Sequence, residues 1–371
     1  MKSNKNNNNK AKPTLKYIAE RLGISKATVS NAFNNPKQLS AALREKIFTE
    51  CQAQGYTGPS ITARSLRTGK TGVIGVLLAD SLAYNFTDPV ASHFLEGVAS
   101  TLDQQHINML LLPSRSDNYQ STQVDTIPDS FIVYGKPKDA DVLQRISQQG
   151  KPMVTVDFDT ELGNSVSVNV DNHGAAYESA KHALSGLNDK VIIVGFRLLN
   201  GCDQLRSVDC EKLEGYTESI SRRRFEGYQD AIQEWGGQFN SSDVWQFPHP
   251  KSQATQMTLR GLLAHPQKNH ATVCLCMSDK LAIATLEAAQ SLGIKVPEQL
   301  RIVGFDNIPE ADTFNLTSIH QPLTEKGKIA AEIALGLREF SSIELPAPLV
   351  IRGSTDSTLP APNIEFTKTK V

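Results

Sequence analysis

The segment Thr14-LKYIAERLGISKATVSNA-Phe33 decides the fold of the first part of the chain. Its apolar residues recur at the spacing of one helical face from Leu15 to Leu22. Gly23 then supplies a residue that can adopt a positive φ and end that helix. Ser25 is of the type that caps a helix, so a second helix is expected to begin directly after it. Two short helices joined by about four residues are typical of a helix-turn-helix.

The second helix of this motif has an apolar inner face and a polar or small outer face. The inner residues Val29, Ala32 and Phe33 are expected to pack against the first helix. The outer residues are of types that bind phosphates or contact base edges, and they are Lys26, Ala27, Thr28 and Asn31. The alternative is an ordinary helical hairpin buried in a core.

A third helix is expected to complete a small helical domain. Ser40 is its predicted N-cap, Gly55 ends it, and Leu43, Ile47 and Phe48 close the core. Residues 1–13 are rich in Asn and Lys and are expected to be disordered. The segment 58–66 is helical in pattern but too short to persist as an isolated helix, so it is expected to fold only when bound.

Charge is distributed unevenly along the 371 residues. Residues 1–72 contain thirteen Lys and Arg against three Glu, whereas the remainder contains 25 Lys and Arg against 36 Asp and Glu. A basic N-terminal part on an acidic body is typical of a nucleic-acid-binding protein whose larger part has a separate task.

From Thr71 onward, apolar runs rich in β-branched residues alternate with amphipathic helices. Examples are the predicted strands Val73–Ala79 and Met153–Val156 and the predicted helix Ala175–Leu184. This alternation predicts parallel sheets covered by helices on both faces. About a dozen strands exceed one compact sheet, so we expect two doubly wound subdomains with a cleft at the carboxyl ends of their strands. The polar segment 197–221 is expected to be a surface loop near that cleft, and 354–371 a loose tail.

Several other functional classes lack support. Gly69-Lys-Thr resembles the end of a phosphate-binding loop, but the first glycine of that motif is replaced by Arg64. Esterase and metalloprotease motifs do not occur, and the five cysteines lack the spacing of metal ligands. We therefore predict no catalytic residue, no metal and no cofactor. The absence of a membrane span or secretory segment favours the cytoplasm, associated with the nucleoid.

These motifs together resemble the lactose-repressor/galactose-repressor (LacI/GalR) family of bacterial transcription regulators, from about Thr14 to Arg352. The resemblance rests on the helix-turn-helix and on six shorter motifs, which are A-R-S-L at 63–66, P-M-V-T-V-D at 152–157, V-D-N-H-G-A-A at 170–176, R-F-E-G-Y at 224–228, S-D-K-L-A at 278–282 and V-G-F-D-N at 303–307. It implies a helix-turn-helix headpiece on a core like that of periplasmic binding proteins.

The resemblance also implies which residues contact DNA. Leu66 matches the leucine that enters the minor groove, and Asn31 stands where the family usually has an arginine, so a different base is expected there. The complete set of candidate DNA-contacting residues is Thr14, Ser25, Lys26, Ala27, Thr28, Asn31, Ala63, Arg64 and Leu66.

Effector contacts follow from the core motifs. Arg224 and Asp306 match the family's effector-binding arginine and aspartate, and Phe86 and Phe247 are candidates to stack on a ring. The candidate effector-binding residues are Phe86, Asp157, Arg224, Phe247, Ser278, Asp279 and Asp306. Each of these residues also has an ordinary structural alternative. Asp279 could be only a helix cap, Arg224 only an ion-pair partner, Asp306 only a turn residue, and both phenylalanines only core residues.

The sequence therefore predicts a ligand-responsive repressor that binds a pseudo-palindromic operator as a homodimer and responds to a sugar or related metabolite. A solute-binding or sugar-processing protein with an incidental helical domain is the alternative. The expected divisions are a tail 1–13, a helix-turn-helix domain 14–58, a hinge 59–70, a core 71–360 with an N-subdomain (71–169 and 322–348) and a C-subdomain (170–321 and 349–360), and a tail 361–371.

Overall fold

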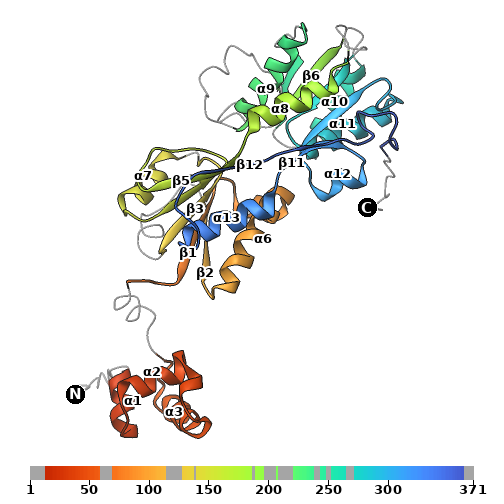
Figure 1. Ribbon diagram of the computed structural model, residues 1–371. Coiled ribbons are helices and arrows are strands. Elements are labelled where there is room, and N and C mark those ends of the chain that lie inside the picture. Colours follow the sequence, from red (N-terminus) through yellow and green to blue (C-terminus); the bar gives the residue numbers. More distant parts are fainter. Residues whose placement is uncertain are drawn as a thin grey trace, which may run out of the picture. The chain divides into compact units, whose positions relative to one another are not determined.

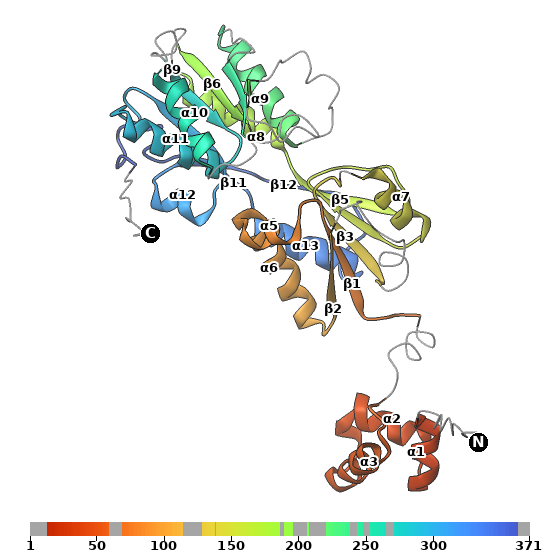
Figure 2. The ribbon, with the colours of Figure 1, turned by 180° about the vertical axis from the view of Figure 1, so that it is seen from behind.

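The computed structural model describes residues 13–58, 69–113, 128–137, 139–185, 189–195, 206–207, 220–237, 243–247, 252–264 and 271–362. The chain divides into two compact units, Met1–Gly72 and Val73–Val371 (Figures 1 and 2). The predicted hinge helix, the tail before Pro13 and most of the segment 197–221 lie outside the described residues.

The first unit is a three-helix domain. Its helices are α1 (Leu15–Leu22), α2 (Lys26–Asn34) and α3 (Ala41–Gln54), with a 3-10 turn η1 (Pro36–Gln38). Thr14, Ser25 and Ser40 cap the three helices, and Gly23 and Gly55 end α1 and α3 with φ angles of 65° and 70°. The predicted caps and stops are confirmed, because each side chain or positive φ satisfies the backbone groups that a helix end leaves unpaired.

The second unit contains two parallel sheets. Sheet A has the strand order β12-β5-β4-β3-β1-β2, and all of its neighbours are parallel. Its strands are β1 (Val73–Leu78), β2 (Asn108–Pro113), β3 (Ser130–Tyr134), β4 (Met153–Val156), β5 (Ser165–Val170) and β12 (Ile343–Leu345). The strands β1, β3 and β4 are almost wholly buried, as expected for strands covered on both faces.

Sheet B has the order β13-β11-β10-β9-β6-β8-β7, and only the pairings of its edge strands β13 and β7 are antiparallel. Its strands are β6 (Lys190–Gly195), β7 (Arg206–Ser207), β8 (Val244–Gln246), β9 (Ala271–Cys276), β10 (Arg301–Asp306), β11 (Thr317–His320) and β13 (Leu349–Val350). The two doubly wound sheets that the alternating pattern predicts are therefore present.

Helices cover both faces of each sheet (Figures 1 and 2). Sheet A lies between α7 (Ala140–Gln148) on one face and α6 (Pro89–Gln104) with α13 (Leu323–Ala334) on the other, and α5 (Leu82–Thr87) precedes α6. Sheet B lies between the pair α8 (Asn172–Ala183) and α9 (Ile220–Glu234) and the pair α10 (Gln253–Ala264) and α11 (Asp279–Ser291), with α12 (Pro309–Thr313) beside α11.

Two expectations about the C-terminal part were wrong. The sequence pattern predicts a last helix over about Leu323–Glu339, but this helix, α13, ends at Ala334, because Gly336 adopts a φ of 72° and terminates it. Residues from Ser354 to 362 are not a loose tail. Ser354 is fully buried. Its hydroxyl donates a hydrogen bond to the carbonyl of Ile302 at 2.6 Å and accepts one from the amide of Thr317 at 2.9 Å.

Candidate functional site

The residues that the sequence nominates for DNA contact lie at the N-cap of α1 and at the start and outer surface of α2. Thr14, Ser25, Lys26 and Ala27 are exposed, and Thr28 and Asn31 are half-buried. The Ser25 hydroxyl accepts a hydrogen bond from the amide of Thr28 at 3.0 Å and lies 2.8 Å from the Thr28 hydroxyl. The start of α2 is thus fixed, and its positive end is available to a phosphate. Ala63, Arg64 and Leu66 lie outside the described residues.

Asn31 already has a partner within the domain. Its Nδ2 donates to Oε1 of Gln38 at 3.1 Å, which connects the end of α2 to η1. A base contact by Asn31 therefore competes with this bond, an effect that the sequence does not reveal.

A cavity of about 200 Å³ lies where strands of both sheets end. Asp80, Gly135 and Asp157 follow β1, β3 and β4 of sheet A, and Ser278 and Gln321 follow β9 and β11 of sheet B. This is the position at which parallel α/β sheets bind ligands. The cavity is lined by Ala79, Asp80, Tyr84, Asn85, Asp88, Val90, Tyr134, Gly135, Asp157, Ile220, Ser221, Arg224, Met277, Ser278, Lys280, Asp306 and Gln321.

Arg224 of α9 is held rigidly at this cavity. Its Nε donates to Oδ1 of Asn172 at 2.9 Å, and its Nη1 donates to the carbonyl of Met277 at 2.5 Å. The guanidinium also lies 3.5 Å from the centre of the Phe305 ring and 3.7 Å from Oδ1 of Asp306. Bonds on two sides and an aromatic face orient the planar group, which suits it for directional hydrogen bonds to a ligand.

Two cavity carboxylates occupy unusual backbone conformations. Asp157 has a φ of 67° and Asp306 a φ of 118°, a region that residues with a Cβ seldom adopt and that often marks functional sites. Burial raises the pKa of Asp306 to about 6, although Arg224 and the hydrogen bond from Gln321 both lower it. The pKa of Asp306 in the folded protein therefore lies well above that of an ordinary aspartate.

Three of the seven nominated effector residues do not line the cavity. Asp279 is fully buried, its Oδ2 accepts from the amide of Ile308 at 2.8 Å, and its Oδ1 accepts from the hydroxyl of Ser318 at 2.5 Å. It fixes the loop after β10, and the helix cap is Ser278, which does line the cavity. Phe247 is fully buried in the apolar core between sheet B and α10–α11, so stacking on a ligand is excluded in this arrangement.

Phe86 is 62% exposed, and α5 contributes its neighbours Tyr84 and Asn85 to the cavity instead. The structure brings together the other four nominated residues, Asp157, Arg224, Ser278 and Asp306. Sequence reasoning missed Asp80, Asp88, Lys280 and Gln321. Asp80 was detectable, because it is the first charged residue after the predicted strand Val73–Ala79.

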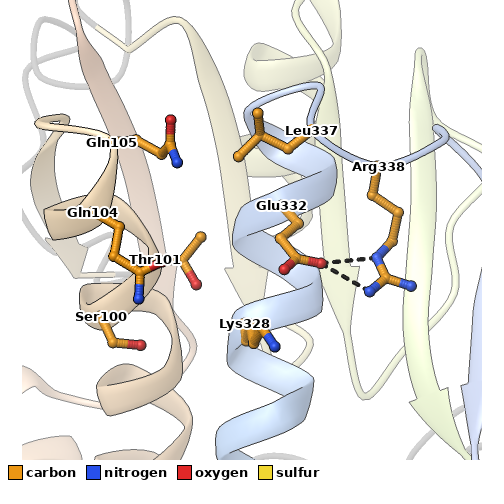
Figure 3. Close-up of a pocket in the computed structure, with 8 residues that line it drawn as sticks. All are labelled: Ser100, Thr101, Gln104, Gln105, Lys328, Glu332, Leu337 and Arg338. Atoms are coloured by element: carbon orange, nitrogen blue, oxygen red, sulfur yellow. Dashed lines mark hydrogen bonds and ion pairs between the residues drawn. The ribbon is translucent and has the colours of Figure 1, made fainter.

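A second cavity of about 280 Å³ lies between α6 and the end of α13 (Figure 3). Its charged residues already have ion-pair partners, because Arg338 binds Oε2 of Glu332 through two nitrogen atoms and Lys328 pairs with Glu325, which is not part of the lining. It lies away from the strand ends and is lined by helix side chains, so the smaller cavity is the better candidate for a ligand.

Among the described residues, none of the helices is long and apolar enough to cross a membrane. Nor does any cluster of His, Cys, Asp and Glu in the described ranges have the arrangement of a metal site.

Both units of the chain match known protein families. Residues 14–58 match the family described as "Bacterial regulatory proteins, lacI family", and residues 206–355 match the "Periplasmic binding protein-like domain". An HTH-type transcriptional regulator of Mycobacterium tuberculosis is 34% identical over 328 residues, which cover 87% of this chain and 90% of that protein.

Solved structures are similar over most of the chain. A LacI-family transcriptional regulator from Corynebacterium glutamicum has a TM-score of 0.65 and 27% identity, covering 92% of this chain and 98% of that one. The complex of the regulator CelR with cellobiose has a TM-score of 0.63 and 19% identity, covering 92% and 99%.

Proposed function

The chain belongs to the LacI family of bacterial transcription regulators, with a helix-turn-helix DNA-binding domain and an effector-binding domain. We therefore propose that it is a repressor, and that a small molecule either releases it from its operator or recruits it there. The site for that molecule is the cavity at the strand ends of sheets A and B. The observation that carries the proposal is the convergence there of Asp157, Arg224 and Asp306 from both sheets.

The DNA-binding part of the proposal rests on the exposed start of α2. Lys26 and Ala27 are exposed there, behind a cap that fixes the helix start. A homodimer would present two such helices to the two halves of a pseudo-palindromic operator. Ala63, Arg64 and Leu66 are proposed to contact the minor groove and its phosphates at the operator centre. A regulator of this kind acts at the chromosome, so we propose a cytoplasmic location.

A sugar or related metabolite is the proposed effector class. Carboxylates and a guanidinium in a cavity of about 200 Å³ are suited to hydrogen-bond the hydroxyls of a small polar molecule. A similar fold binds cellobiose in the CelR complex. Ligand binding at the ends of both sheets would favour one angle between them, and affinity for the ligand and for the operator would then be reciprocally linked.

The test combines operator selection with one variant. DNA from a randomised library is selected on the full-length protein, and binding is measured by electrophoretic shift at several salt concentrations. Effector candidates come from a thermal-shift screen of metabolites. We expect sequence-specific retention, and we expect Arg224→Ala to abolish the effector's influence while operator affinity changes little. Retention without sequence preference would refute the proposal that the protein is a sequence-specific regulator. A normal effector response in Arg224→Ala would show that this arginine is not part of the effector site.

A further inference from the structure

Tyr134 is the last residue of β3 in sheet A, and it lines the cavity at the strand ends. Its ring stacks on the ring of Phe94 in α6, with the ring centres 4.4 Å apart and the planes inclined by 14°. Its carbonyl accepts from the amide of Ala79 at 3.0 Å, and the amide of Gly135 donates to the carbonyl of Val156 at 3.0 Å. Ring stacking and these backbone bonds hold the side chain in one place.

The hydroxyl of Tyr134 has no hydrogen-bond partner within the part of the chain that the structure describes. Polar groups withdrawn from bulk water normally have a partner, so an unpaired hydroxyl at a cavity wall is available to a ligand. Burial raises the pKa of Tyr134 well above its ordinary value, and the charges of Asp157 and Asp88 raise it further. The hydroxyl therefore keeps its proton at neutral pH and can donate it.

A hydrogen-bond acceptor lies on the neighbouring strand. The strand β4 pairs with β3 so that Val156 is opposite Tyr134, and Asp157 follows Val156 at the cavity. Oδ1 of Asp157 accepts from Nζ of the fully buried Lys326 at 2.6 Å, and Lys326 also donates to Oε1 of Gln321 at 2.9 Å. These bonds fix the carboxylate, and its Oδ2 accepts from no residue in the described ranges. Two adjacent strand ends thus offer a donor and an acceptor.

A ligand hydroxyl suits this pair of groups, because one oxygen atom can accept a hydrogen bond and donate another. A carboxylate or an ionised phosphate oxygen accepts without donating, and an ammonium donates without accepting. We propose that Tyr134 is a further effector-binding residue, whose hydroxyl donates a hydrogen bond to one hydroxyl group of the effector beside the carboxylate of Asp157. The inference rests on the proposed function, because it places the effector in this cavity.

Two variants separate ligand binding from a structural role. Tyr134→Phe removes the hydroxyl and keeps the ring that stacks on Phe94. It breaks no hydrogen bond to a described residue, so the thermal unfolding midpoint of the ligand-free protein should not fall. Tyr228→Phe is the matched control, because Tyr228 is fully buried in α9, does not line the cavity, and donates to the carbonyl of Cys276 at 3.2 Å. This control should lower the midpoint and leave effector affinity near that of wild type.

Binding is measured by calorimetry on the full-length protein, with D-glucose, D-ribose and cellobiose as probes. We expect at least one of these sugars to bind the wild type, and its dissociation constant should rise about tenfold in Tyr134→Phe, as expected for the loss of one hydrogen bond. The monodeoxy derivatives of that sugar then locate the contact. At one position, removal of the sugar hydroxyl should weaken binding to wild type about tenfold more than binding to Tyr134→Phe, because the variant already lacks one bond to that hydroxyl.

The inference is overturned if Tyr134→Phe binds the sugar as tightly as wild type, if every deoxy derivative loses the same factor in both proteins, or if none of the three sugars binds. A midpoint that falls as far in Tyr134→Phe as in Tyr228→Phe would also overturn it, because the hydroxyl would then have a partner within the protein. Operator binding by the same preparations keeps the proposed function separate. A wild type that retains operator DNA specifically remains a regulator, even where Tyr134 makes no contact with its effector.

Discussion

The Nζ atom of Lys280 lies 2.6 Å from Oδ1 of Asp88, so an ion pair joins the start of α11 on sheet B to the start of α6 near sheet A. Both side chains line the cavity, and both are largely buried. Asp88 is also the N-cap of α6, because its Oδ2 accepts from the amide of Ala91 at 3.2 Å. One carboxylate thus fixes a helix start and connects the two sheets.

We predict that Asp88→Asn lowers the free energy of unfolding of the core by about 1.5–3 kcal/mol, the range for a hydrogen bond to a charged group. Asparagine is also a good N-cap, so this change removes the charge and spares the helix start. Lys280→Met should have a similar effect, and the double variant should cost less than the sum of the two. Urea denaturation followed by circular dichroism measures all three. Additive effects would show that the pair does not form in solution.

The main elements of the core were predictable, because their periods depend on local sequence. The strands β1 and β4 lie within a residue of the predicted runs Val73–Ala79 and Met153–Val156, and the caps of the first unit are also where they were predicted. The strands β11 (Thr317–His320) and β12 (Ile343–Leu345) were missed. Each is short and mixed in polarity, and β12 exists through its pairing with β5, about 175 residues earlier.

The site was less predictable, because identical residue types differ only in their distant neighbours. Asp279 and Asp306 both follow or end an apolar strand. The carboxylate of Asp279 accepts hydrogen bonds from Ile308 and Ser318, whereas Asp306 lines the cavity. The sequence did not indicate that Lys326 is buried, since a lysine within an amphipathic helix is usually exposed. Its burial depends on Asp157, which is 169 residues earlier in the chain.

Asn31 provides a prediction about sequence choice. Arginine in its place favours guanine over adenine, so Asn31→Arg should change the preference at one symmetric pair of operator positions by about 1–3 kcal/mol. Selection from a randomised operator library measures this preference. Gln38→Ala should strengthen the wild-type preference instead, because it releases Asn31 from the 3.1 Å bond within the domain. An unchanged preference in both variants would show that Asn31 does not touch a base.

Gly97 provides a prediction about packing. A Cβ added at Gly97 in α6 would lie 2.0 Å from the carbonyl oxygen of Thr324 at the start of α13. Backbone cannot yield as a flexible side chain can, so Gly97→Ala should destabilise the core by at least about 1–3 kcal/mol. Gly261→Ala in α10 is the matched control, because a Cβ added there would have no atom outside its own helix backbone within 4 Å, and alanine favours a helix by roughly 0.5–1 kcal/mol. Equal effects of the two changes on thermal unfolding would contradict the close approach of α6 and α13.

Asp306 provides a prediction about pH. Its pKa is raised from 3.8 to about 6 in the folded protein, chiefly by burial. The folded state therefore binds this proton more tightly than the unfolded state, so the contribution of Asp306 to stability is fully present below pH 3.8 and is lost as pH rises through 6. We expect Asp306→Asn, which cannot ionise, to gain stability relative to wild type across this interval, with a slope of at most about 1.4 kcal/mol per pH unit.

The measurement is the free energy of unfolding of both proteins in urea at several pH values from 4 to 8. Taking the difference between the two proteins cancels the titration of the other groups, provided that the substitution leaves their pKa values unchanged. Asp279 is the exception to check, because the charge of Asp306 helps to raise its pKa, and Asp279→Asn in both backgrounds removes that contribution. A difference that does not vary between pH 4 and 6 would mean that Asp306 ionises in the folded protein as it does in the unfolded chain. Arg224 and Gln321 would then compensate its burial completely.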